Sequence, residues 1–386
     1  MQFVVFAESF SDEAFYVKTH ALECKFNSVI SANLKKNIPG KFYLTFLLFV
    51  TLFRGMPNFR RFKSSHATAV YHCISRTTNG EHLFNAAEKE MLRKHLHQTA
   101  EFCGAEIITY AIMANHFHVL VYFPRKNTPD DAELLRRYKV LHPQPTPYAT
   151  ARIEVLKTLL EANGPDARKM REKLLARMGD LSEFMKTLKQ RFSIWFNHTH
   201  NRFGTLWAER FSSTIVEGHG HFALKTMAAY IDLNPVRAGL VKDPKDYRWC
   251  GYGEAIAFGG PILKGLRLMM ENEKPLDDES VLSGYRMLLF GKGTAPKAHG
   301  APGATLSPES FAEVTKTDGK LPLSQRLRLR VNWLTCGAVI GSQQFVIDHL
   351  VDYRKRTRSR HHLKPCPFSR DGTTDWLSLF AMRASR

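Results

Sequence analysis

The chain has 386 residues, of which 44% are hydrophobic, and this composition is typical of a globular protein and excludes a disordered chain. Its 55 lysines and arginines outnumber its 36 aspartates and glutamates, and the net charge of +19 favours a polyanionic partner, with nucleic acid as the leading candidate. The six cysteines form no C-x-x-C pair, so neither a zinc knuckle nor a disulfide framework is indicated, and we expect a cytoplasmic protein.

The N-terminal segment, residues 1–55, has poor periodicity and one apolar run at 42–53. That run is shorter than the roughly 20 residues that a membrane-spanning helix needs. It also lacks the N-terminal position and cleavage site of a signal peptide, so we expect no membrane partner. Met56 then opens a basic stretch that resembles a fresh N-terminus. We therefore expect residues 1–55 to be an extension that is not native, and a chain starting at Met56 to fold and bind DNA.

Alternating strands and one helix are predicted between residues 67 and 123. Residues 69–76 alternate as in a strand, 86–102 have helical spacing before a glycine, and 107–113 form a second strand. Only Ala114 and Asn115 separate this strand from the next, at 116–123. The two should therefore form a tight antiparallel hairpin, which gives the order β-α-β-β.

An insertion at about 125–180 follows, with a loop marked by Pro143, Pro145 and Pro147 and then two charged helices at 153–162 and 167–178. The main pattern then resumes with an amphipathic helix at 181–196, a strand at 211–216, and a helix that Asn234-Pro235 should end. We interpret the whole as an α+β protein with a ferredoxin-like split βαββαβ fold and an antiparallel sheet. The predicted domain covers residues 56–258.

Residues 259–386 are expected to form a linker and a basic, mostly helical C-terminal extension. The linker-like stretch is 291–308, and two helices are predicted at 327–340 and 342–358. The second runs into a basic tail that starts near Arg354. Two interpretations remain open for this region, a small helical DNA-binding appendage and a solvated basic tail.

The strand at 116–123 carries the first candidate site. Side chains alternate in a strand, so His116 and His118 share one face with Leu120, while the opposite face is fully apolar. Two imidazoles in this arrangement can ligate one metal ion. The alternative is that they form the half-exposed polar face of an ordinary strand.

A second candidate pair lies on the helix that ends at Asn234-Pro235. Tyr230 and Asn234 are four residues apart and therefore share one face of that helix. A tyrosine can attack a phosphate that a hard cation activates, and the Asn234 carbonyl oxygen could bind the same ion. The alternative for Tyr230 is a core aromatic residue. A second His-x-His, His198 and His200, lies in a predicted polar loop, and we interpret it as a surface or DNA contact.

Five motifs in order resemble the single-tyrosine transposases of the HUH (His-hydrophobic-His) endonuclease superfamily, most closely the REP-associated tyrosine transposases. They lie at residues 71–76, 113–121, 206–211, 230–241 and 247–252. The resemblance covers residues 56–257 and implies that His116 and His118 are metal ligands, Tyr230 the nucleophile and Asn234 the third ligand. Ala114 stands where proline is usual in the family, and the insertion is longer than in compact members.

The resemblance implies a DNA transposase and endonuclease that cleaves and rejoins single-stranded or hairpin DNA through a 5′-phosphotyrosine intermediate. Mg2+ or Mn2+ is expected, because two imidazoles and an amide oxygen suit a labile octahedral cation. The candidates for DNA contact are Arg76, Lys189, Arg191, Trp207, Arg210 and Arg237. For the basic members of this set, a solvated surface charge is the alternative.

Two other functions compete with this one. A domesticated DNA-binding protein could keep the fold and lack cleavage, although binding alone needs none of the four site residues. A zinc hydrolase would need a further ligand and does not explain Tyr230. The sequence leaves open whether the protein is a monomer or a homodimer, and which DNA it targets.

Overall fold

The computed structural model describes residues 62–64, 68–125, 128–218, 222–270, 275–290, 334, 338–357, 363–367 and 380–384. The predicted N-terminal extension and the linker at 291–308 lie outside these residues. Residues 59–386 form one compact unit. No helix in the described ranges is long and apolar enough to cross a membrane.

Four antiparallel strands are adjacent in the sheet, in the order β2-β3-β1-β4, with β2 at its edge. Their bounds are β1 (Ala69–Arg76), β2 (Glu106–Ile112), β3 (His116–Phe123) and β4 (Ser212–Val216). Because β3 is antiparallel to both of its neighbours, β1 and β2 run parallel to each other on either side of it, with helix α3 (Ala86–Cys103) between them in the chain. This is the split arrangement that the element order predicted, and the α+β class is confirmed.

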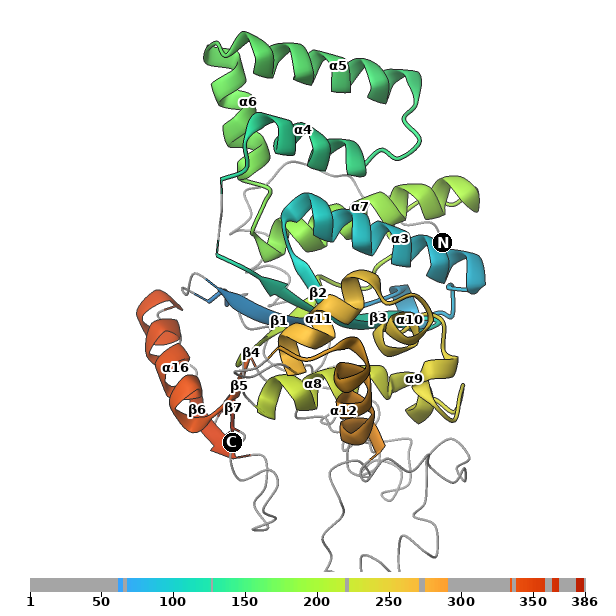
Figure 1. Cartoon of the computed structure of the whole chain (residues 1–386), viewed down its shortest axis with the longest axis vertical. Coiled ribbons are helices and arrows are strands. Elements are labelled where there is room, and N and C mark those ends of the chain that lie inside the picture. Colours follow the sequence, from blue (N-terminus) through green and yellow to red (C-terminus); the bar gives the residue numbers. More distant parts are fainter. Residues whose placement is uncertain are drawn as a thin grey trace, which may run out of the picture. The chain divides into compact units, whose positions relative to one another are not determined.

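Helices cover both faces of this sheet (Figure 1). On one face, α3 and α7 (Leu181–Thr199) receive the apolar side of β3, where Phe117 contacts Trp207 and Phe123 contacts Phe184. The other face carries the helices that follow β4 (Figure 1). Their bounds are α8 (Phe222–Asp232), α9 (Asn234–Arg237), α10 (Gly251–Phe258), α11 (Gly260–Met270) and α12 (Asp278–Phe290). The alternation of β3 therefore determines which side chains meet which helical layer.

The helices on the second face of the sheet continue past residue 258, where the domain was predicted to end. Helix α11 packs on β2 so closely that a Cβ atom on Gly265 would lie 2.2 Å from the carbonyl oxygen of Ile107. Only glycine allows that approach of helix to strand. Helices α11 and α12 are thus part of the layer over β2 and α8, not part of a separate linker.

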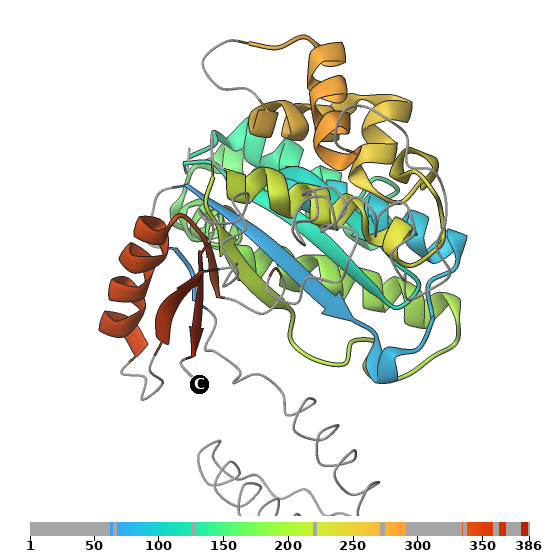
Figure 2. The same cartoon turned by 90° about the horizontal axis from the view of Figure 1, so that it is seen from below.

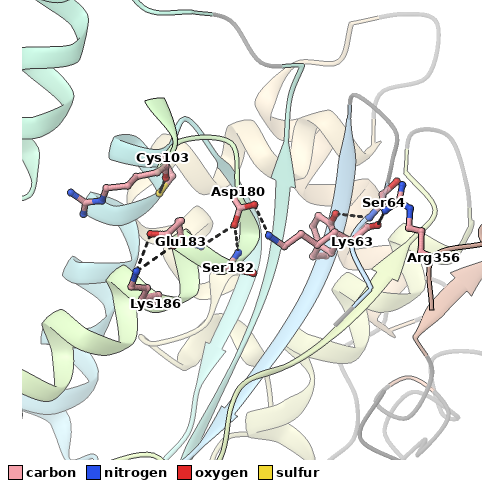
Figure 3. Close-up of polar contacts among 10 residues, drawn as sticks. Lys63, Ser64, Cys103, Asp180, Ser182, Glu183, Lys186 and Arg356 are labelled. Carbon is pink, nitrogen blue, oxygen red and sulfur yellow. Dashed lines mark hydrogen bonds and ion pairs between the residues drawn. The ribbon is translucent and has the colours of Figure 1, made fainter. Parts of the chain in front are cut away.

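The helix ends on the first face follow from local sequence. Asn85 and Glu88 form a capping box at the start of α3, and Gly104 ends it in the left-handed conformation at φ 66°. Asp180 caps α7 by accepting hydrogen bonds from the backbone N–H groups of Ser182 and Glu183. Figure 3 shows Asp180 between this helix start and Lys63, whose Nζ lies 2.5 Å from its carboxylate.

The insertion contains three helices and not the two that the sequence predicted. They are α4 (Asp131–Val140), α5 (Pro147–Ala162) and α6 (Pro165–Leu175), and they lie beyond the α3 and α7 layer (Figure 1). The missed helix, α4, begins with a side-chain cap from Asp130. Arg171 of α6 holds α4 through two 2.6 Å bonds to the carboxylate of Asp131.

The C-terminal extension adds three strands to the sheet besides the expected helix. The sheet order becomes β2-β3-β1-β4-β5-β7-β6, with β5 parallel to β4. The added elements are β5 (Val339–Gly341), α16 (Gln343–Thr357), β6 (Leu363–Pro367) and β7 (Phe380–Ala384), with α16 beside β6 and β7 (Figure 2). The helix predicted at 327–340 is wrong at Val339 and Ile340, because these β-branched residues are buried against the exposed edge of β4. The rest of that prediction lies almost entirely outside the described residues.

Candidate active site

The two histidines of β3 lie on the face that meets α8, as the alternation predicted. Their ring centroids are 5.2 Å apart. His118 is 2% exposed, whereas His116 is half-buried at the start of the strand. The turn before them is fixed by hydrogen bonds from Thr77 N–H to the Asn115 carbonyl and from Phe84 N–H to the Ala114 carbonyl, both 2.9 Å long. The pair therefore projects from a rigid hairpin.

Each imidazole uses its Nδ1 atom for a hydrogen bond inside the protein. His116 Nδ1 lies 2.7 Å from Asn115 Oδ1, and His118 Nδ1 lies 2.9 Å from Nε2 of His72. These bonds orient both rings and leave Nε2 as the nitrogen that neither bond occupies. Ligating histidines in metalloproteins are commonly held in this way by a second group.

Burial favours the neutral form of His72 and His118. It lowers the pKa of His72 to about 3, and the nearby backbone of Leu334 opposes this shift only in part. Burial also holds the pKa of His118 well below its usual value, and the nearby His72, His116 and Arg237 lower it further. A metal ligand must be a neutral imidazole, so this environment favours the form that can bind an ion.

Tyr230 of α8 lies against His118, with ring centroids 6.3 Å apart and planes at 81°. Its side chain is 4% exposed. Arg237 of α9 also contacts Tyr230. The guanidinium carbon lies 4.0 Å from the centre of the Tyr230 ring, and Nη2 donates a 2.8 Å hydrogen bond to the Tyr230 carbonyl. A positive charge is thus fixed beside the predicted nucleophile.

Asn234 begins α9 one turn after Tyr230, and Pro235 determines how its side chain is used. A helix would normally bring the N–H of residue 235 to the Ile231 carbonyl, but proline has none. The Asn234 Nδ2 atom donates to that carbonyl instead, over 3.2 Å. Because Nδ2 is engaged, the amide oxygen Oδ1 is the atom that can act as a ligand.

Asp232, between these two residues, fixes the helix to its surroundings. Its fully buried carboxylate accepts hydrogen bonds from the hydroxyls of Thr109 on β2 and Tyr285 on α12, and from the backbone N–H of Tyr252. Burial raises its pKa to about 6, although these hydrogen bonds oppose the shift. Asp232 and His72 were not among the site residues predicted from the sequence. For His72, its place beside His118 on the same sheet face was the available signal.

The predicted donors are of the chemical kinds that a divalent cation binds. His116 and His118 can offer Nε2, and Asn234 can offer an amide oxygen, which leaves positions for phosphate and water as Mg2+ and Mn2+ require. No group of three or more His, Cys, Asp and Glu residues suited to a metal occurs in the described ranges. The predicted set depends on an amide as its third donor.

The residues predicted to contact DNA separate into two groups. Arg76 is paired with His116 in the β1–β3 ladder, and Arg237 lies on Tyr230, so these two are at the histidine site. The others belong to the opposite face or its rim. Arg191 donates to the Leu141 carbonyl and to Gln98, and Trp207 packs on Phe117 and donates to Ser193.

Arg191 and Trp207 therefore have structural contacts that tie α7 to its neighbours. Burial lowers the pKa of Arg191 to about 10, which is consistent with that position. Lys189 donates a 2.9 Å hydrogen bond to the Glu209 carbonyl and lies 5.2 Å from the Trp207 ring, while Arg210 is exposed before β4. Trp207 is bridged to Thr77, and the N–H of Ala208 donates to the carbonyl of Arg76, so this segment lies next to the His116 end of the ladder. Contact of these four residues with DNA stays a prediction.

A pocket of about 420 Å³ lies at the other end of the β1–β3 ladder. Its lining includes Ala69 and Phe123, which pair with each other, whereas His116 pairs with Arg76 at the far end. Lys63 and Asp180 form an ion pair at this pocket (Figure 3). The pocket is therefore separate from the histidine site.

A family model supports the resemblance seen in the motifs over part of the chain. The family model "Transposase IS200 like" matches residues 65–139, a range that contains both histidines but not Tyr230 or Asn234. Among solved structures, one described as a REP-associated tyrosine transposase bound to a REP hairpin is 15% identical, with a TM-score of 0.34. That similarity covers 58% of this chain and 96% of the other. No curated protein matches the chain.

Proposed function

We propose that this chain, whose residues 65–139 carry the sequence of an IS200-like transposase, cleaves and rejoins single-stranded DNA through a covalent tyrosine intermediate. The observation that carries the proposal is the contact between Tyr230 and His118. Strand β3 and helix α8 are far apart in the chain. Their packing brings the ring centroids of the predicted metal ligand His118 and the predicted nucleophile Tyr230 to 6.3 Å. A protein that only binds DNA needs no such arrangement.

In the proposed reaction, the Tyr230 oxygen loses its proton and attacks a backbone phosphorus. The bond from phosphorus to the 3′ oxygen breaks, that oxygen takes a proton, and the 5′ end remains on the protein as a phosphotyrosine. A 3′-OH from another strand can then reverse the step, so no external energy source is needed. A bound Mg2+ or Mn2+ would make the phosphorus a better electrophile by drawing charge from a phosphate oxygen.

The chain's own residues would position and hold the reacting groups. His116, His118 and Asn234 would hold the ion, and Arg237 would stabilise negative charge near the Tyr230 ring. Tyr230 and His118 are nearly buried, whereas His116, Asn234 and Arg237 are half-buried. DNA is therefore expected to approach from the His116 end of β3, where Arg76 is exposed.

The test uses the full chain and a pool of labelled single-stranded hairpins, with Mn2+ or with a chelator. We expect a covalent protein–DNA product that survives a denaturing gel and forms only with the metal. If the wild-type chain binds hairpins but forms no such product on any of them, it is a DNA-binding protein that retains the fold without cleavage. Binding itself should weaken steeply between low and moderate salt, since phosphate contacts release counterions.

A further inference from the structure

His72 of β1 contacts His118 in a way that the proposed reaction does not explain. It lies on the same sheet face, one register step away, because His72 pairs with Leu120 and Ile74 pairs with His118. The two rings are stacked at 10° with centroids 5.1 Å apart, and His72 Nε2 is 2.9 Å from His118 Nδ1. His72 is 1% exposed, so neither water nor DNA competes strongly for this bond.

One proton lies between these two nitrogens. Whether His72 or His118 carries that proton determines whether Nε2 of His118 can bind a metal. A neutral imidazole carries a proton on one nitrogen only. If His72 donates, His118 accepts on Nδ1 and its own proton occupies Nε2, which then cannot be a ligand. If His118 donates, its Nε2 carries a lone pair that can bind an ion.

His116 provides an internal comparison. Its Nδ1 faces the Oδ1 of Asn115, which is an acceptor, so His116 donates from Nδ1 and keeps the Nε2 lone pair. The two rings lie side by side on one strand face, and a shared ion requires the same tautomer at both. His72 is the group in a position to impose that tautomer on His118.

We propose that His72 is a positioning residue that accepts the Nδ1 proton of His118 and thereby fixes Nε2 of His118 as the metal-binding nitrogen. The inference rests on the proposed function, because it assigns a use to a metal site that the function requires. His72 acts through His118 and does not touch the DNA or the ion. Its contribution is the orientation and tautomer of one ligand.

The first measurement needs no metal, and a variant protein serves only to assign the signals. In the metal-free full chain at pH 7.5, nitrogen-15 NMR of the imidazoles reports which nitrogen of each histidine carries a proton. The His118 signals are assigned by their absence from His118→Gln. We expect the proton on Nδ1 of His118, and a proton on Nε2 would overturn the proposal whatever the protein does with DNA.

The second measurement compares three substitutions by the rise in melting temperature with Mn2+ concentration, which gives the Mn2+ dissociation constant. His72→Phe keeps a ring against His118 but removes the acceptor, so it should weaken Mn2+ binding by about 10- to 100-fold. His72→Gln retains an acceptor oxygen and should restore affinity to within about threefold. His95→Phe is the control, since His95 lies on α3 against Phe192, on the opposite face.

A purely structural role for His72 would lower the melting temperature without metal and leave the Mn2+ dissociation constant unchanged, and that result would contradict the proposal. If His72→Phe does not fold, His72→Gln and the wild-type tautomer still decide the question. If the wild type binds no Mn2+, the metal-dependent function fails, while the NMR result separately supports or overturns the tautomer assignment.

Discussion

The chain contains two His-x-His sequences, and they have different surroundings. His116 and His118 lie on β3, where alternation puts both rings on one face, 5.2 Å apart. His198 and His200 lie at the end of α7, where residues two apart are separated by about 200° around the helix. There the His200 ring lies against Phe196, with ring centroids 4.4 Å apart, and its Nε2 is 3.1 Å from the Glu88 carboxylate, while both histidines are exposed. The same sequence pattern makes a potential metal site only in a strand.

The difference shows that a motif is informative when its secondary structure is known. The sequence predicted a loop around His198, but α7 continues past the expected end at Phe196 to Thr199. Each histidine of the β3 pair has a partner for Nδ1, and Tyr230 faces one of them. At the end of α7, His200 instead contacts Phe196 and the carboxylate of Glu88 on α3.

The largest effect is expected from a substitution in the His116–His118 pair, compared with the same substitution in the His198–His200 pair. His118→Ala removes a predicted ligand beside Tyr230, so cleavage of hairpin DNA should fall below detection, a loss of at least about 1,000-fold. The stabilisation of the protein by Mn2+ should also disappear. His198→Ala, the matched control, should retain both. Equal losses in the two variants, measured by adduct formation and melting temperature, would show that the two motifs are not distinguished by their elements.

Burial of Asp232 on α8, the helix that carries Tyr230, should make the free energy of unfolding depend on pH. Asp232 has an unfolded pKa near 3.9 and a folded pKa of about 6, so between these values the native state holds a proton that the unfolded state has lost. Stability from this group therefore falls as pH rises from 4 to 6, by up to about 3 kcal/mol. Urea unfolding of wild type and Asp232→Asn across this range gives the difference.

The Asp232→Asn variant should lose that pH-dependent component, so its stability relative to wild type should rise steadily between pH 4 and 6. Asp243, which is paired with Arg286, provides the control, because Asp243→Asn should not remove the fall assigned to Asp232. A constant difference between wild type and Asp232→Asn over this range would contradict the assigned pKa.

A substitution at Asn234 tests whether its amide oxygen is the third metal ligand. Asn234→Ala removes the amide oxygen, and we expect Mn2+ affinity to fall at least tenfold, about 1.4 kcal/mol. It also leaves the Ile231 carbonyl without the Asn234 Nδ2 donor, so metal-free stability should drop by about 1 kcal/mol. Asn197→Ala loses a comparable bond, to the Gly204 carbonyl, and should not alter metal affinity. Calorimetric titration with Mn2+ would count against a role for Asn234 if both variants bound equally.

The smallest effect is expected at the second His-x-His. His200→Ala breaks its contact with Glu88 at the start of α3. Because His200 is exposed, the loss in unfolding free energy should stay below about 1 kcal/mol, with cleavage unchanged. Chemical denaturation measures this directly. A loss of several kcal/mol would mean that the helix-end histidine has a larger structural role than its exposure suggests.

The sequence predicted the parts of the molecule that depend on local pattern. Strand alternation correctly assigned the two faces of β3, and a single glycine marked the end of α3. Tertiary pairing was not predictable in this way. Val339 and Ile340 were assigned to a helix, yet they pair with the edge of β4, and the sequence has no signal for that distant partner.

In the candidate site, too, some features follow from local sequence and others depend on tertiary packing. Tyr230 and Asn234 could be put on one helix face from their spacing, but the contact of Tyr230 with His118 depends on how α8 crosses the sheet. Arg191 and Trp207 look like DNA contacts in sequence because exposure cannot be read from residue type. Their hydrogen bonds to Leu141 and Ser193 became visible only in the folded chain.

The most direct test of the account asks which residue becomes joined to DNA. Full-length protein is incubated with a cleavable hairpin and Mn2+, digested, and the nucleotide-bearing peptide is identified by mass spectrometry, in parallel with Tyr230→Phe. The account predicts that the modified peptide contains Tyr230, and that Tyr230→Phe binds the hairpin with nearly unchanged affinity but forms no adduct. An adduct on another tyrosine, or one that persists in Tyr230→Phe, would contradict the assignment of this helix to the active site.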